Sequence, residues 1–172
     1  RFATIFGVSP RIRFDIVINM LVGMAISRGK IILNSDGEAW RPNLYIDDAC
    51  RAILLAINHN HMSGQLLKLN IGRKDCNLKI IEIAKIIQNL IPNCEIQFLQ
   101  SNPGLDKEKL IADRKINEGT DKRTYKVSFD QINTVFEDIA CKVDVPSGIG
   151  KLIEFLKKIN LDEKTFQSKR FY

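Results

Sequence analysis

The segment that most constrains the fold runs from Gly37 to Ile57 and reads GEAWRPNLYIDDACRAILLAI. Pro42 cannot donate a backbone hydrogen bond, and it restricts the residue before it to extended conformations. Asp47 and Asp48 favour a helix start, because carboxylates complement the positive end of a helix. Small and apolar residues then share one helix face: Ala52, Leu55 and Ala56. The segment predicts a strand-like NLYI run and a helix that together present the Arg41 guanidinium at the rim of the fold.

Hydrophobic periodicity predicts alternating strands and helices along the rest of the chain. Strands are expected at 1–6, 30–33, 65–70, 95–99 and 125–127, and helices at 14–28, 47–58, 78–90, 129–136 and 149–159. Gly29 is expected to close the first helix. The polar stretch 100–122 predicts a mobile loop or an interrupted helix, which leaves a lid over a ligand and plain disorder as alternatives. A chain of 172 residues with this alternation is expected to form one α/β domain.

Composition narrows the class of protein. The chain is 45% hydrophobic and 27% charged, which is ordinary for a soluble globular domain. No apolar run reaches the roughly 20 residues that a membrane helix needs. The cysteines at 50, 76, 94 and 141 form no CxxC pair, which favours buried free thiols in the cytoplasm over a disulfide framework. Cys50 is expected on the apolar side of its helix. His59 and His61 lack partners at ligand spacing, so no metal site is expected.

The formal charge of +6 has two interpretations. A nucleic-acid-binding module would interleave basic and aromatic residues and carry a recognised motif, whereas the basic residues here are spread along the chain. A pocket for a diphosphate would itself use several arginines, because the guanidinium fork holds two oxygens at once. The second interpretation is favoured, and nucleic-acid binding is kept as the alternative.

Several different motifs follow one another along the chain in a fixed order. These are RFATIFG (Arg1–Gly7), SPRIRFDIVIN (Ser9–Asn19), Lys30–Leu33, Arg41–Asp48, LLKLNIG (Leu66–Gly72) and DKRTYKVSFDQI (Asp121–Ile132). In this order they resemble the C-terminal part of the extended short-chain dehydrogenase/reductase family, the NAD-dependent sugar-nucleotide epimerases and dehydratases. The resemblance implies the last strands of a Rossmann-type sheet, with 1–7 and 65–72 as its remnant strands, plus a small mixed α/β substrate-binding subdomain. Residues 1–172 would then form one substrate-binding unit.

Two family motifs do not occur in the sequence. There is no Gly-x-x-Gly-x-x-Gly turn for the cofactor phosphates and no Tyr-x-x-x-Lys pair for the catalytic base. The chain is therefore expected to be a fragment without catalytic residues, without activity and without bound cofactor. Its parent would use NAD or NADP on a nucleotide-sugar and form a homodimer. The fragment is expected to self-associate through the strand edge at 1–6. A non-catalytic scaffold of the same descent is a further alternative.

The resemblance also assigns roles to arginines. Arg41 and Arg123 would grip the substrate diphosphate from distant parts of the chain. A surface salt bridge is the alternative for Arg41, and Arg114, Lys122 and Lys126 compete with Arg123 for the alignment. Two further arginines, Arg11 and Arg13, lie in a loop that faces the substrate cleft in the resembled enzymes, and they would either neutralise phosphate or be solvated.

The remaining assignments concern polar and apolar residues around the reacting sugar. Asn19 would hydrogen-bond the nucleotide, with a solvent-facing amide as the alternative. Thr4 would lie beside the sugar and the nicotinamide, or be an ordinary strand residue. Ala3 and Ile5 would flank the nicotinamide ring. Tyr45 lies where many members of the family have histidine. It is counted among the substrate-binding residues, although a packing role is the simpler one. Because Asn43 replaces a frequent aromatic residue, the sugar and the base stay open.

Overall fold

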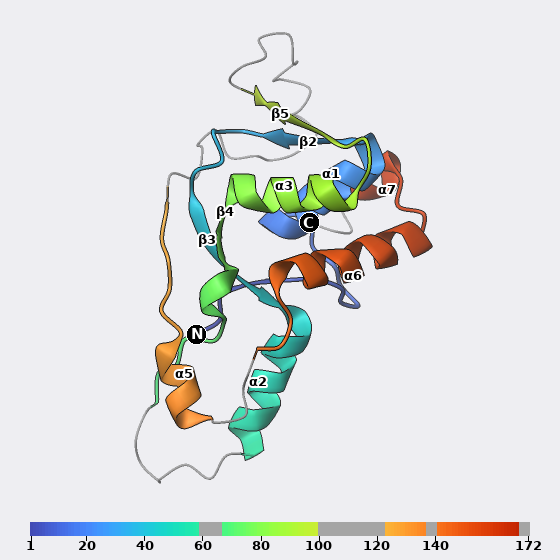
Figure 1. Cartoon of the computed structure of the whole chain (residues 1–172). Helices are drawn as coiled ribbons and strands as arrows, with labels where there is room; N and C mark the ends of the chain where they lie inside the picture. The colour runs from blue at the N-terminus through green and yellow to red at the C-terminus, as the bar shows by residue number, and fades with distance from the viewer. Residues whose placement is uncertain (59–66, 100–122, 137–140, 169–172) are drawn as a thin grey trace.

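The computed structural model describes residues 1–58, 67–99, 123–136 and 141–168. Five strands form two small sheets (Figure 1): β1 (Thr4–Phe6), β2 (Lys30–Leu33), β3 (Trp40–Tyr45), β4 (Asn77–Lys79) and β5 (Glu95–Phe98). In the first sheet the order is β1-β3-β4, with β1 parallel and β4 antiparallel to β3. In the second sheet β2 and β5 are parallel. The predicted mixed α/β class is confirmed.

Helices surround these sheets in two groups (Figure 1). Their bounds are α1 (Val17–Arg28), α2 (Ile46–Asn58), α3 (Ile80–Leu90), α5 (Asp130–Val135), α6 (Val145–Lys158) and α7 (Glu163–Phe166), with a 3-10 turn at η1 (Lys74–Cys76). Gly29 closes α1 as predicted: it has a φ of 67°, and its N–H donates to the carbonyl of Ala25 at 3.1 Å. A left-handed residue at this place favours glycine.

The helices bury two separate apolar clusters. The larger cluster lies among α1, α3, α6 and α7, and it includes the fully buried Phe14, Ile18 and Ile83. The smaller cluster joins residues 1–3, 69–71, α2 and α5, with Leu44 and Ile132 among its buried members. Helix α2 therefore covers a different part of the core from the other long helices.

The segments 1–3 and 69–71 lie side by side and parallel. Phe2 and Ile71 form a parallel bridge. The N–H of Ala3 donates to the carbonyl of Ile71 at 3.1 Å, and the N–H of Ile71 donates to the carbonyl of Arg1 at 2.7 Å. The predicted strand at 65–70 is thus represented by a short extended segment, because the pairing is limited to these few residues; residues 65 and 66 lie outside the described ranges.

Several predicted boundaries differ from the structure. Helix α3 begins at Ile80 and not at 78, because residues 77–79 pair with β3 as β4. The strand expected at 125–127 is wrong. This segment is extended, but the main chain of Val127 is paired with a side chain. The side chain of Asn77 accepts from the N–H of Val127 at 2.9 Å and donates to the carbonyl of Val127 at 3.1 Å. Helix α6 begins at Val145, four residues before its predicted start, because the Asp144 carboxylate accepts from the N–H of Ser147 at 2.7 Å.

The thiols are free, as expected, but their burial was predicted only in part. Cys76, Cys94 and Cys141 are buried, whereas Cys50 is exposed because it lies on the outer side of α2. None of the helices in the described ranges is long and apolar enough to cross a membrane. Two other predictions, for the 100–122 loop and for the histidines at 59 and 61, fall outside the described residues.

Candidate functional site

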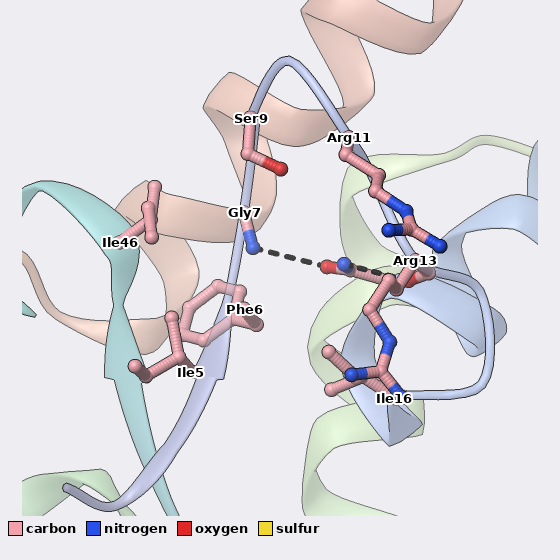
Figure 2. Close-up of a pocket in the computed structure, with 9 residues that line it drawn as sticks. Ile5, Phe6, Gly7, Ser9, Arg11, Arg13, Ile16 and Ile46 are labelled. Atoms are coloured by element: carbon pink, nitrogen blue, oxygen red, sulfur yellow. Dashed lines mark hydrogen bonds between the residues drawn. The ribbon is translucent and has the colours of Figure 1, made fainter. Parts of the chain in front are cut away.

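A pocket of about 220 Å³ opens where β1 ends and the chain turns towards α1 (Figure 2). It is lined by Ile5, Phe6, Gly7, Ser9, Arg11, Arg13, Ile16, Asn19 and Ile46. Figure 2 shows Ile5 and Ile46 on one side, with Arg11 and Arg13 across from them on the loop that leaves β1. The pocket therefore combines an apolar wall with two guanidinium groups.

Asn19 fixes the shape of this pocket. The residue is 3% exposed, its Oδ1 accepts from the N–H of Gly7 at 3.0 Å, and its Nδ2 donates to the carbonyl of Arg13 at 2.9 Å. The amide thus ties the end of β1 to the arginine loop. An amide nitrogen carries two hydrogens, so one donor remains for a ligand. The predicted contact with a nucleotide is compatible with this position and stays a prediction.

Gly7 is required at the floor of the pocket. Its φ is 120°, and a Cβ at this position would lie 2.5 Å from Cε2 of Tyr45. Tyr45 itself is buried, and its ring meets the ring of Phe6 edge-on at a centroid distance of 5.5 Å. Burial, assisted by the charge of Asp47, raises the pKa of the Tyr45 hydroxyl. Tyr45 therefore packs behind the pocket as a neutral side chain, outside its lining.

The two loop arginines differ in their partners. Arg13 donates from Nε to Oδ1 of Asp15 at 3.0 Å, and Nη2 also contacts that carboxylate. This hydrogen bond lowers the pKa of Asp15 and raises that of Arg13. Arg11 is exposed, and it forms no ion pair with any carboxylate in the described part of the chain. Arg11 is therefore the cation that can turn towards an anionic ligand at the lowest cost.

Arg41 occupies a different environment from the predicted one. It is 7% exposed, and its Nη1 donates to the carbonyl of Trp40 at 2.8 Å and also to the carbonyl of Arg123. The expectation that it stands at the rim is wrong, because the segment that begins at Arg123 folds over β3. The two arginines that were predicted to act together are therefore neighbours. The guanidinium of Arg41 contacts the main-chain carbonyl of Arg123, and Arg123 itself is exposed. Neither lines the pocket beside β1.

Residues 123–126 contact the start of β3, where the hydroxyl of Thr124 accepts from the N–H of Trp40 at 3.1 Å. The guanidinium carbon of Arg41 lies 5.8 Å from the ring centroid of Tyr125, and Nζ of Lys126 lies 3.6 Å from the ring centroid of Trp40. The Trp40 side borders a second hollow of about 330 Å³, which also contains Lys74 and Asn77. Sequence reasoning missed this hollow, because Lys126 is adjacent to Trp40 only in the folded chain.

The predicted residues at positions 3–5 have separate surroundings in the structure. Ile5 lines the pocket, Ala3 is buried in the smaller apolar cluster, and Thr4 is half-buried outside the pocket lining. Sequence reasoning missed the apolar wall formed with Ile16 and Ile46. The available signal was the position of Ile46 directly after a buried strand. Among the described residues no group of three His, Cys, Asp or Glu side chains could hold a metal ion.

Comparison with known proteins shows a sequence match over part of the chain and a similar fold over most of it. Residues 1–72 match the model of the NAD dependent epimerase/dehydratase family. UDP-glucuronic acid 4-epimerase from Bacillus cereus, solved with NAD and a fluorinated UDP-sugar, is 22% identical with a TM-score of 0.66, covering 92% of this chain and 44% of that one. dTDP-glucose 4,6-dehydratase from Bacillus anthracis, in complex with NAD, is 19% identical with a TM-score of 0.65, covering 96% and 46%.

ADP-L-glycero-D-manno-heptose-6-epimerase from Helicobacter pylori is 16% identical with a TM-score of 0.66, covering 91% of this chain and 42% of that one. This chain thus spans less than half the length of each of these three solved structures. Residues 1–72 match the NAD dependent epimerase/dehydratase family in sequence, and the chain has the fold of one part of such Rossmann-type enzymes.

Proposed function

We propose that this chain is the nucleotide-diphosphate-sugar binding portion of an NAD-dependent sugar-nucleotide epimerase or dehydratase. The observation that carries the proposal is the pocket beside β1, where Arg11, Arg13 and the buried amide of Asn19 face an apolar wall. All of these residues lie within the segment that matches the family. Guanidinium groups suit a diphosphate, because each can hold two oxygens in charge-assisted hydrogen bonds.

The residues present in this chain indicate which part of the reaction it would carry out. NAD, when bound to the whole enzyme, would take up and return a hydride of the sugar. The glycine-rich turn and the tyrosine base belong to the remainder of the enzyme, so this chain would touch the cofactor only through the wall around Ile5. Its own residues bind and orient the substrate, and binding energy from the nucleotide end fixes the reacting carbon. The roles assigned to Arg41 and Arg123 in diphosphate binding stay predictions, because neither residue lines the pocket beside β1.

The state of the cysteines supports a setting for this activity. The buried thiols at 76, 94 and 141 are free, which suits a reducing compartment such as the cytoplasm. The assembled enzyme is proposed to be a homodimer, and the isolated chain is proposed to be inactive. Turnover of a nucleotide-sugar with NAD by this chain alone would contradict the proposal.

Binding can be tested by titration with nucleotide-sugars. We expect UDP- or dTDP-sugars to shift amide resonances of the loop 9–13 in spectra of the 19.6 kDa chain, with a Kd of about 1 mM. Arg11→Ala should weaken binding by about tenfold, because a charge-assisted hydrogen bond is lost. Lys158→Ala removes a charge from an exposed position on α6 and serves as the control. Equal effects of the two changes would remove Arg11 from the site.

The same titration distinguishes the proposed nucleotide-sugar pocket from the alternative, a nucleic-acid-binding module. A polyanion-binding module would lose affinity steeply as salt rises and would not distinguish sugar or base. A nucleotide-sugar pocket should discriminate between bases and show a shallow dependence on salt, because it holds only two phosphates.

A further inference from the structure

The loop that carries Arg11 and Arg13 is anchored in the core by the residue that follows it. Phe14 is 0% exposed, although both arginines before it are exposed. Side chains in a close-packed core have few alternative positions, so a buried ring fixes the main chain to which it is attached. The position of the Arg13 guanidinium therefore depends on what surrounds the ring of Phe14.

Helix α7, near the other end of the chain, supplies part of that surrounding. Figure 1 shows α7 beside α1. Phe166, the last residue of α7, is 0% exposed, and its ring meets the ring of Phe14 edge-on, with a centroid distance of 4.9 Å and an angle of 66° between the planes. Such aromatic pairs stabilise a fold beyond the area that they bury. Phe166 does not itself line the pocket beside β1.

Gly23 gives the two rings their place on α1. A Cβ at this position would lie 2.3 Å from Cε2 of Phe166 and 3.2 Å from Cδ1 of Phe14. A glycine inside a helix weakens the helix, because it adds flexibility and contributes no side chain to packing. The close approach of the rings to the main chain of α1 offsets that weakness and requires the glycine.

Arg28 attaches α7 to the end of α1 as well. Its Nε lies 3.1 Å from Oε1 of Glu163, and its guanidinium carbon lies 5.6 Å from the ring centroid of Phe166. The Arg28 side chain is only 11% exposed, so solvent screens this contact less than it screens a surface pair. Helix α7 is thus connected both to the last residue of α1 and, through Phe14, to the arginine loop.

We infer that α7 positions the arginine loop for its ligand, with Phe166 as a positioning residue that acts through Phe14. The inference rests on the proposed function. Asn19 holds the loop from the side of β1, because its Nδ2 donates to the carbonyl of Arg13 at 2.9 Å. The aromatic pair holds the loop from the side of α7. A loop held on both sides loses less conformational freedom when Arg11 and Arg13 bind an anion, and this favours binding.

A double-mutant cycle on the two rings tests the inference in the whole chain. Phe166→Leu keeps an apolar side chain in the core but removes the edge-on contact. We expect the backbone order parameters of residues 11–13 in the free protein to fall from about 0.85 towards 0.6. Binding of UDP- or dTDP-sugars should weaken by about fivefold. Phe14→Leu should act similarly, and the double variant should add little to either single change, because both remove the same contact.

Ile87→Ala is the matched control, because Ile87 is fully buried in the same apolar cluster but lies on α3. It should lower the unfolding temperature as well, yet leave the order parameters of residues 11–13 and the binding unchanged. Gly23→Ala provides a second test, since its methyl group would displace the Phe166 ring and should loosen the same loop.

The inference and the proposed function fail in different ways. Unchanged order parameters in both Phe166→Leu and Gly23→Ala would overturn the inference, as would equal loosening of the loop by Ile87→Ala. Fully additive losses of binding in the double variant would also overturn it, because the two rings would then act independently. Absent binding by the unchanged chain would contradict the proposed function, while the order parameters of the free variants would still show whether α7 holds the loop.

Discussion

At the scale of single residues, polar side chains connect segments that regular pairing does not join. Asn19 links the end of β1 to the arginine loop, Asn77 satisfies the main chain of Val127, and Arg41 binds the carbonyl of Arg123. Each of these contacts joins parts of the chain that are distant in sequence. The candidate pocket and the cover over β3 therefore depend on a few buried or half-buried polar groups as well as on apolar packing.

Arg41→Ala should lower the free energy of unfolding by about 1.5–3 kcal/mol, because main-chain carbonyls lose a charged donor in a buried place. Urea unfolding followed by circular dichroism measures the change. Arg13→Ala is the matched control, since the Arg13 and Asp15 side chains are 58% and 39% exposed and an exposed pair contributes only about 0–1 kcal/mol. Equal losses for the two variants would show that Arg41 is not a structural tie.

At the scale of elements, α6 carries two glycines in different surroundings. A Cβ at Gly148 would lie 2.7 Å from ring atoms of Phe6 and Tyr45, whereas nothing lies within 4 Å of a Cβ at Gly150. Gly148→Ala should destabilise the chain by about 1–3 kcal/mol through overpacking. Gly150→Ala should stabilise it by roughly 0.5–1 kcal/mol, because alanine favours a helix. Thermal unfolding compares the two variants, and changes of the same sign would refute the close approach at Gly148.

These glycines also show where sequence reasoning fails. Helices α1, α2 and α3 have strong apolar periodicity or a clear end signal, and they were predicted nearly in full. The start of α6 was missed, because the glycines at 148 and 150 are poor helix formers, although Asp144 at the N-cap and Pro146 in the first turn are signals of a helix start. The burial of Arg41 was missed for a different reason. Its partners come from a segment more than 80 positions away, and no local pattern reports such a contact.

The N-cap of α6 makes stability depend on pH. Hydrogen bonds from Ser147 lower the pKa of Asp144 below its usual 3.8. A lowered folded-state pKa stabilises the protein above the unfolded-state value, and this stabilisation is lost as the pH falls through the folded-state value. Asp144→Ala should therefore cost about 1 kcal/mol near neutral pH and much less once the pH falls below the lowered folded-state pKa of Asp144. Glu154→Ala, at an exposed site on the same helix, is the control, and a pH-independent cost would exclude this cap.

At the scale of the whole molecule, the two apolar clusters predict unequal stability. The larger cluster buries α1, α3, α6 and α7 together, whereas the smaller one is closed by α2, α5 and the pair at 1–3 and 69–71. Because Ile53, Leu54 and Ile57 of α2 are already exposed, opening this helix exposes little additional apolar surface. Regions with few buried contacts open at lower free energy than the rest of a protein.

Hydrogen exchange can test this difference on the chain as it is. We expect the amides of α2 to exchange well before those of α1 and α3, which are helices of similar length but lie in the larger cluster. Mass spectrometry of peptides from the three helices gives the order directly. Equal protection of the three helices in the 172-residue chain would show instead that the two clusters unfold as one unit.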